Sequence, residues 1–244
     1  MTLFGLVGKN IGYSFSKNYF TEKFQNLGLK EYFYQNFDLE TIDTLPEIIA
    51  KNPDLQGFNV TIPYKEKIIQ YLDAIDDEAQ KIGAVNVVKI TNDRKLIGYN
   101  TDFYGFSKSL ESLLTKNHKK ALILGNGGAS KAIFYALEQL KIPYTIVSRT
   151  KNATNITYTE IDKKIILEHQ IIINATPLGT FPNVDNCPDI PYNYLNNNHL
   201  CYDLIYNPSE SLFLKLAKEK GALTKNGLEM LQLQAEKSWE IWQK

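Results

Sequence analysis

The chain has 244 residues, which is enough for one large domain or two modest ones and excludes a small peptide-like scaffold. Its 27 basic residues balance its 27 acidic residues, so no net field favours nucleic acid or an anionic membrane as a partner. With 43% hydrophobic residues and no apolar run of the roughly 18 residues that a membrane span needs, the composition is typical of a soluble globular protein. We therefore expect a soluble protein that binds neither nucleic acid nor a membrane.

The segment MTLFGLVGKN at the N-terminus has neither the basic region nor the apolar region of a secretion signal. The only cysteines, Cys187 and Cys201, are too few for a disulfide framework, so we expect a reducing cytoplasm. No Cys/His cluster has the spacing of metal ligands, and we expect no bound metal. The composition fits a monomer and a homodimer equally.

The first hundred residues alternate between strand-like and helix-like patterns. Segments rich in aromatic and β-branched residues predict strands over 4–8, 31–39, 57–64 and 84–90. Apolar residues at helical spacing predict a helix capped by Ser16, and the apolar residues from Ile68 to Ile75 predict a second helix. The polar segment TNDRK predicts a turn between two strands, and a further helix is predicted to begin at Phe103.

The second half of the sequence has a different pattern. Short, almost continuous apolar runs predict buried parallel strands over 121–125, 144–148, 171–174 and 199–206. Helical segments such as KAIFYALEQL lie between them, which is the βαβ alternation of a nucleotide-binding fold. Residues 227–242 place apolar side chains at helical spacing and predict a final amphipathic helix. We predict an α/β protein with a domain boundary near residue 102.

The sequence ALILGNGGASKAI predicts a strand, a tight turn and a helix. Gly125 and Gly127 permit the turn and a close approach to a pyrophosphate, and Gly128 extends that approach. Ser130 takes the place of the third glycine in the pattern G-x-G-x-x-G, which weakens the match. The alternative is a βα turn without a ligand.

The next βα unit ends in YTIVSRT, which bears on the choice of cofactor. Folds specific for NAD place an acidic residue on the ribose hydroxyls about 20 residues past the glycines. Here Ser148, Arg149 and Thr150 stand in that place. A guanidinium can bind a 2′-phosphate through two hydrogen bonds, so the sequence favours NADP over NAD. A solvated surface arginine is the alternative.

Two hydroxyls lie close together in GYSFSKNYF. Ser14 and Ser16 flank a predicted helix start, where hydroxyls and open N–H groups can hold a small anion such as a carboxylate. In the alternative, Ser16 is only the N-cap and Ser14 a turn residue.

Several polar residues interrupt apolar segments in the first domain. Asn59 and Thr61 alternate with apolar residues and so share one face of a strand, with Lys65 in the segment that follows. Asn86 interrupts an apolar strand, and Asp102 lies between a strand and a helix. Buried polar side chains need partners, so these residues satisfy one another or bind a hydroxylated ligand. For Asp102 the alternative is a helix N-cap.

These motifs follow one another in a specific order. GYSFSK, NVTIPYKE, IGAVN, GYNTDFYG, GNGGAS, SRT, INAT, DLIYNP and NGLEML with a later glutamine resemble the shikimate dehydrogenase family from Gly12 to Trp242. The resemblance implies a substrate domain of residues 1–102 plus 227–244, a Rossmann-like NADP domain of residues 103–226, and a cleft between them. It also implies reversible reduction of 3-dehydroshikimate to shikimate with NADPH, a step in making aromatic amino acids.

The resemblance also implies roles for individual residues. Those implied to bind substrate are Ser14, Ser16, Asn59, Thr61, Lys65, Asn86, Asp102, Tyr206 and Gln234. Those implied to bind the cofactor are Asp77, Gly125, Asn126, Gly127, Gly128, Ala129, Ser148, Arg149, Thr150, Lys151, Asn152, Ala153, Leu204 and Gly227. Lys65 and Asp102 would be the catalytic pair, because an ammonium can stabilise the charge on a reduced ketone oxygen and supply its proton.

Some positions depart from the family pattern, and two rival functions remain. Lys17 and Tyr64 replace a proline and a histidine that the family commonly has there. One rival is a quinate/shikimate dehydrogenase that uses NAD, which the paired serines and Arg149 disfavour. The other is a non-catalytic NADP-binding regulatory protein, which the presence of both Lys65 and Asp102 disfavours.

Overall fold

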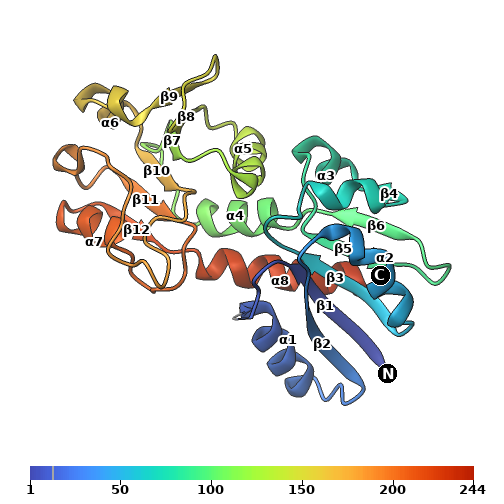
Figure 1. Cartoon of the computed structure of the whole chain (residues 1–244). Helices are drawn as coiled ribbons and strands as arrows, with labels where there is room; N and C mark the ends of the chain where they lie inside the picture. Colours follow the sequence, from blue (N-terminus) through green and yellow to red (C-terminus); the bar gives the residue numbers. More distant parts are fainter. Residues whose placement is uncertain (13) are drawn as a thin grey trace. The chain divides into compact units, whose positions relative to one another are not determined.

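The computed structural model of the chain describes residues 1–12 and 14–244. It divides into two units, unit 1 with residues 1–101 and 235–244 and unit 2 with residues 102–234 (Figure 1). Helix α8 (Leu228–Gln243) therefore contributes residues to both units. The sequence-based division assigns all of residues 227–244 to one domain, whereas the structure groups residues 227–234 with unit 2.

Unit 1 is built on a mixed sheet in the order β2-β1-β3-β5-β6-β4. Its strands are β1 (Thr2–Gly8), β2 (Tyr32–Asp38), β3 (Leu55–Val60), β4 (Ala74–Ile75), β5 (Val87–Ile90) and β6 (Leu96–Tyr99). Strand β1 pairs in parallel with β2 and β3, while β5 runs antiparallel to β3 and β6. The TNDRK segment forms the turn between β5 and β6, as predicted, and Arg94 within it has a left-handed φ of 63°.

Both faces of this sheet are covered. The helical elements are α1 (Phe15–Asn26), η1 (Ile42–Thr44), α2 (Leu45–Lys51), η2 (Lys67–Tyr71) and α3 (Asp77–Ile82), together with the end of α8. On one face, Phe4 packs with Phe20 of α1 and Trp242 of α8 in an aromatic cluster. On the other face, Val7 belongs to a core that includes Leu45 of α2. Alternation along β1 sends neighbouring side chains to these two cores.

The helix predicted across Ile68–Ile75 is wrong. Ile68 is buried as that pattern requires, but the segment forms η2 and then the short strand β4. The Asp73 amide donates to the Leu96 carbonyl at 2.9 Å, and the Asp73 carboxylate accepts from the Leu96 amide at 2.7 Å. Pairing with a strand some twenty residues later therefore overrides the local helical spacing.

Unit 2 is built on an all-parallel sheet in the order β12-β11-β10-β7-β8-β9. Its strands are β7 (Ala121–Leu124), β8 (Tyr144–Ser148), β9 (Asn155–Thr157), β10 (Ile171–Asn174), β11 (Leu200–Asp203) and β12 (Leu223–Lys225). Strands β7, β10 and β11 are buried along their whole length. This explains their continuous apolar runs, and the prediction of parallel strands over them is confirmed.

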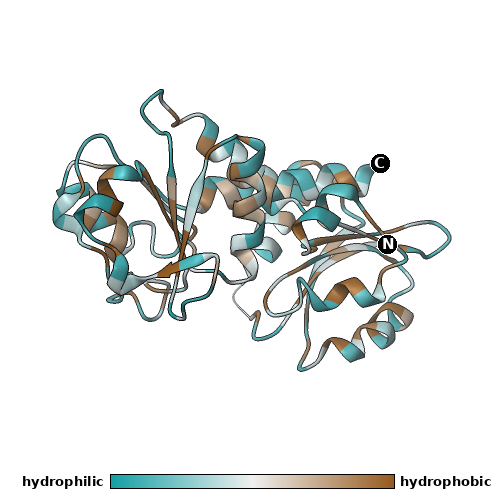
Figure 2. Ribbon diagram, turned by 90° about the horizontal axis from the view of Figure 1, so that it is seen from above, coloured by the Kyte–Doolittle hydropathy of each residue, from teal (hydrophilic) through white to brown (hydrophobic). Residues whose placement is uncertain are grey.

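Helices cover both faces of this sheet as well. They are α4 (Asp102–Glu111), α5 (Gly128–Gln139), α6 (Lys163–Glu168) and α7 (Leu212–Glu219), with the short turns η3 (Tyr158–Glu160) and η4 (Tyr192–Tyr194). Ile123 and Ile173 pack with α4 and α5, whereas Leu122 and Ile172 pack with α6 and α7. Figure 2 shows the hydrophobic colouring gathered on the strands within each unit. The predicted α/β class with two sheets is confirmed.

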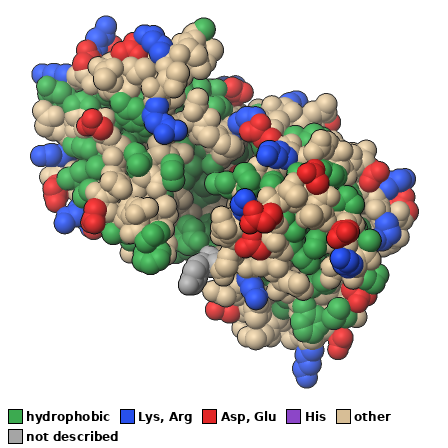
Figure 3. Space-filling model, viewed as in Figure 1, with side chains coloured by type: hydrophobic (Ala, Val, Ile, Leu, Met, Phe, Trp, Pro, Cys, Tyr) green, Lys and Arg blue, Asp and Glu red, His purple; other side chains and the backbone are tan. Residues whose placement is uncertain are grey.

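The surface carries charges of both signs. Figure 3 shows acidic and basic side chains interspersed on the face it presents. Among residues 1–12 and 14–244, no helix combines the length and the apolar character that a membrane crossing requires.

Candidate functional site

The polar residues singled out in unit 1 gather where β3 ends. The Asn86 carbonyl accepts from the Val60 amide at 2.8 Å, and the Lys65 carbonyl accepts from the Val85 amide at 2.8 Å. These two bonds hold the segment after β3 beside the segment before β5. The residues brought together in this way are Asn59, Thr61, Lys65 and Asn86.

Two buried amides lie at the centre of this group. Asn59 and Asn86 are only 4% and 3% exposed. Asn59 Oδ1 accepts from the Tyr34 hydroxyl at 2.7 Å, and Asn59 Nδ2 donates to Ser238 Oγ at 3.1 Å. Asn86 Oδ1 accepts from the Thr101 amide at 2.7 Å. Sequence reasoning missed Tyr34 and Ser238, because they lie 25 and 179 residues from Asn59 and outside every local motif.

The two serines have different surroundings. Ser14 is the N-cap of α1, where its hydroxyl accepts from the Lys17 amide at 3.3 Å. The prediction that Ser16 caps this helix is therefore wrong. Ser16 is buried in the first turn, and its side chain interacts with the Tyr34 hydroxyl. Tyr13, in the same motif, lies outside the described residues.

The remaining residues assigned to substrate belong to unit 2. Asp102, 8% exposed, is the first residue of α4, so that helix starts one residue earlier than predicted. Tyr206 follows β11, and partial burial raises the pKa of its hydroxyl. Gln234 is buried in α8, where its side chain donates to a carbonyl of the same helix at 3.0 Å. Lys65 belongs to unit 1, and its pairing with Asp102 stays a prediction.

The glycine-rich turn joins β7 to α5 in unit 2. Gly125 has a φ of +107°, and a Cβ there would lie 3.0 Å from the Thr176 methyl group, so this position requires glycine. A Cβ on Gly127 or Gly128 would meet nothing within 4 Å. The turn is therefore open above the N-terminus of α5, as a phosphate site requires. The Ser130 hydroxyl donates to the Gly125 carbonyl at 3.1 Å and so stabilises the turn in place of the third glycine.

A cavity of about 300 Å³ adjoins this turn. Its lining consists of Gly125, Asn126, Gly127, Ser148, Arg149, Tyr158, Ala175, Thr176, Pro177 and Leu178. The structure thus brings the glycine turn and the SRT segment to one cavity. Tyr158 and Arg149 both line this cavity. Burial raises the pKa of the Tyr158 hydroxyl, and the positive charge of Arg149 opposes that rise. Tyr158 carried no sequence signal, whereas Thr176 belongs to the INAT segment.

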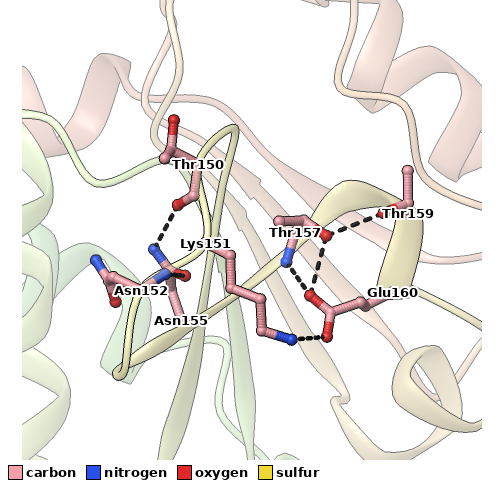
Figure 4. Close-up of polar contacts among 7 residues, drawn as sticks. All are labelled: Thr150, Lys151, Asn152, Asn155, Thr157, Thr159 and Glu160. Atoms are coloured by element: carbon pink, nitrogen blue, oxygen red, sulfur yellow. Dashed lines mark hydrogen bonds and ion pairs between the residues drawn. The ribbon is translucent and has the colours of Figure 1, made fainter.

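The loop that carries Arg149 is organised by Asn155, another residue that the sequence did not single out. Asn155 Nδ2 donates to Ser148 Oγ at 2.6 Å and to the Thr150 carbonyl at 3.1 Å. Asn155 Oδ1 accepts from the Asn152 amide at 2.8 Å (Figure 4). Asn155 is only 8% exposed, so its buried side chain holds the loop of residues 148–152 in place through these three hydrogen bonds.

Lys151, assigned to the cofactor, forms an ion pair with Glu160 (Figure 4). The Glu160 carboxylate also accepts from the Thr157 amide at 2.8 Å and from its hydroxyl at 2.9 Å. Lys151 and Thr157 together lower the pKa of Glu160 to about 2. Lys151 thus has an acidic partner close to its own loop.

Leu204 and Gly227 lie against each other beyond the end of β11. The Gly227 amide donates to the Ile205 carbonyl at 3.0 Å, and a Cβ on Gly227 would lie 2.2 Å from the Leu204 carbonyl oxygen. Beside them, burial raises the pKa of Asp203 to about 6, although Ser211 and two further donors oppose the rise. Asp77, also assigned to the cofactor, is an exposed residue that begins α3 in unit 1.

Comparison with known proteins shows one consistent similarity. Residues 6–88 match the family model of the shikimate dehydrogenase substrate binding domain. The shikimate dehydrogenase (NADP(+)) of Methanococcus aeolicus is 40% identical, with 98% of this chain and 91% of the relative aligned. A crystal structure of a shikimate dehydrogenase in complex with NADP+ has a TM-score of 0.86 and 36% identity, covering 99% of this chain and 90% of the other.

A second solved structure agrees with this similarity. It is the shikimate 5-dehydrogenase of Thermus thermophilus in complex with NADP(H) and shikimate. Its TM-score is 0.87 at 29% identity, and the alignment covers 99% of this chain and 93% of that one. The similarity therefore extends over both units and over almost the whole length of the relatives.

Proposed function

Because the chain belongs to the shikimate dehydrogenase family, we propose that it catalyses the reversible reduction of 3-dehydroshikimate to shikimate with NADPH. The observation that carries this proposal is the combination of two sites in one chain. Unit 1 holds a buried cluster of amides and hydroxyls near Lys65, and unit 2 holds an open glycine turn beside Arg149. The proposed reaction is a step of aromatic amino acid biosynthesis in the cytoplasm, and a monomer or a homodimer would serve it.

The two units divide the work in this proposal. The domain of residues 1–102 plus 227–244 binds the substrate, and the domain of residues 103–226 binds NADP. Ser14 and Ser16 hold the substrate carboxylate, which fits their position at the start of α1, where the helix dipole favours an anion. The residues proposed for the ring hydroxyls are Asn59, Thr61, Asn86 and Asp102. Tyr206 and Gln234 complete the pocket.

Lys65 and Asp102 transfer the proton to and from the substrate oxygen in the proposed mechanism. When bound, NADPH supplies the hydride. As the ketone carbon is reduced, negative charge develops on its oxygen, and the Lys65 ammonium stabilises that charge and donates a proton. The Asp102 carboxylate keeps the ammonium charged and oriented. In the oxidation direction the pair takes the proton back.

Arg149 sets the cofactor preference in this proposal. It is exposed at the edge of the cavity beside the glycine turn, where a guanidinium can bind a 2′-phosphate. The proposed pyrophosphate residues are Gly125, Asn126, Gly127, Gly128 and Ala129. The residues proposed for the adenosine phosphate end are Ser148, Arg149, Thr150, Lys151, Asn152 and Ala153. Leu204 and Gly227 are proposed on the nicotinamide side, and Asp77 at the edge of the cofactor.

Initial rates test this function. Purified protein would be assayed with shikimate or quinate as substrate and NADP or NAD as acceptor, followed by nicotinamide absorbance. We expect strong activity only with shikimate and NADP. Comparable rates with quinate or NAD would instead indicate a quinate/shikimate dehydrogenase. No activity from folded protein that still binds NADPH would refute the catalytic function and support a regulatory one.

A further inference from the structure

Asn59 is held by two residues that have no role in the proposed site, Tyr34 of β2 and Ser238 of α8. We propose that Tyr34 and Ser238 are positioning residues that fix the orientation of the Asn59 amide and thereby set the donors and acceptors that the substrate meets. This inference rests on the proposed function, in which Asn59 binds a ring hydroxyl.

The argument begins with the two ends of an asparagine side chain. The oxygen and the NH₂ group have almost the same shape, so a half-turn of the amide exchanges an acceptor for two donors at little steric cost. The surrounding hydrogen bonds decide which orientation is populated. In this structure the Tyr34 hydroxyl donates to Asn59 Oδ1 at 2.7 Å, and Asn59 Nδ2 donates to Ser238 Oγ at 3.1 Å. A turned amide would present its NH₂ group to Tyr34 and its oxygen to Ser238, so both hydrogen bonds would have to reverse. Its oxygen would also replace Nδ2 as the neighbour of the Asn86 carbonyl, to which Nδ2 donates at 3.4 Å.

The Tyr34 hydroxyl is well placed to resist that reversal. Tyr34 as a whole is 6% exposed, and its ring stacks on the ring of Phe20, with the ring centroids 4.8 Å apart and the planes 12° from parallel. Burial raises the pKa of Tyr34 well above its usual range, so the phenol keeps its proton for donation. Ser16 interacts with the same hydroxyl, which links the proposed carboxylate subsite to Asn59. Hydrogen bonds in such a water-poor environment are stronger than at the surface.

Ser238 extends the network to the second buried amide. Its hydroxyl lies 3.3 Å from Thr101 Oγ1, and the Thr101 amide donates to Asn86 Oδ1 at 2.7 Å. Ser238 has no exposed surface, so water cannot replace its contacts without a rearrangement. Ser238 therefore connects Asn59 and Asn86, the two amides proposed to meet the ring hydroxyls.

The first test is Tyr34→Phe, assayed with shikimate and NADP. Removing one buried hydrogen bond should raise the KM for shikimate about tenfold and leave the KM for NADP unchanged, with kcat altered less than about twofold. Ser238→Ala should change the same constants in the same direction. Tyr192→Phe is the matched control, because it removes a tyrosine hydroxyl that donates to the Pro188 carbonyl at 2.7 Å within unit 2. It should leave the KM for shikimate unchanged.

A double-mutant cycle separates positioning from general destabilisation. If Tyr34 acts through Asn59, adding Tyr34→Phe to Asn59→Ala should produce no further rise in the KM for shikimate. A further tenfold rise in the double variant, or an unchanged KM in Tyr34→Phe alone, would overturn the inference. The wild-type rate separates the two proposals, since a wild type that turns over shikimate leaves the proposed function intact in either case. A wild type without turnover would refute the proposed function and this inference with it.

Discussion

Removal of the Asn155 side chain should weaken NADP binding through the loop that carries Arg149. Asn155 donates to Ser148 Oγ and to the Thr150 carbonyl and accepts from the Asn152 amide. At about 1 kcal/mol for each hydrogen bond, Asn155→Ala removes about 3 kcal/mol of interactions that order this loop. Thr150 and Asn152 are exposed, so water can replace part of the lost hydrogen bonding. We therefore take about 2 kcal/mol as the net loss of loop-ordering free energy. In the variant, NADP binding must supply this free energy of about 2 kcal/mol to order the loop, so the KM for NADP should rise about 30-fold.

Steady-state kinetics with both nicotinamide cofactors would check this expectation. The rise in KM should be larger for NADP than for NAD, because only NADP carries the 2′-phosphate that Arg149 is proposed to bind. Asn196→Ala is a suitable control, since Asn196 Oδ1 accepts from the Asn198 amide at 2.9 Å in the loop that precedes β11, a strand separated from β9 by β10, β7 and β8. Equal effects on NADP and NAD, or an unchanged KM in Asn155→Ala, would refute the reasoning.

Three further predictions concern other parts of the chain. Lys65→Ala should reduce kcat by at least about 10²-fold with unchanged NADPH affinity in a fluorescence titration, and wild-type turnover would contradict its proposed role. Gly227→Ala should lower the free energy of unfolding by at least about 2 kcal/mol in urea titrations, because the added Cβ would clash with Leu204. Gly127→Ala has open space for its Cβ, so it should leave the free energy of unfolding unchanged and weaken NADP binding. Equal unfolding midpoints for the two variants would contradict this. Burial raises the pKa of Asp203 from 3.8 to about 6, so the folded state binds this proton more tightly than the unfolded chain. Relative to Asp203→Asn, the wild type should then lose about 2 kcal/mol of its free energy of unfolding as pH rises from about 4 to about 6, as measured by urea titrations of both proteins.

The sequence predicted the sheet of unit 2 better than the details of unit 1. Strands buried on both faces have continuous apolar runs, and β7, β10 and β11 were recognisable from those runs alone. In unit 1 the segment from Ile68 to Ile75 has helical spacing, yet its conformation is set by pairing with β6. Such long-range pairing leaves no local pattern, so a single sequence could not reveal it.

The same limit applies to the candidate site. The glycine turn, the serines and the two asparagines were found because each interrupts a local pattern. Tyr34 and Ser238 interrupt none, since a tyrosine suits an aromatic strand and a serine is tolerated in a helix. Asn155 likewise resembles an ordinary loop residue. Their importance comes from contacts across the fold, which only coordinates can show.

The division of α8 between the two units affects the order in which the units can fold during synthesis. Unit 2 is one continuous stretch, residues 102–234, whereas unit 1 needs residues 235–244 to join residues 1–101. Trp242 fills part of the aromatic core beside Phe4, so that core stays incomplete until those residues leave the ribosome. Although domains generally fold in order of synthesis, the aromatic core on one face of the N-terminal sheet is complete only after the end of α8 has been made. Unit 2 can therefore complete its core first, and a nascent chain halted before residue 235 would expose the apolar face of β1 to chaperones.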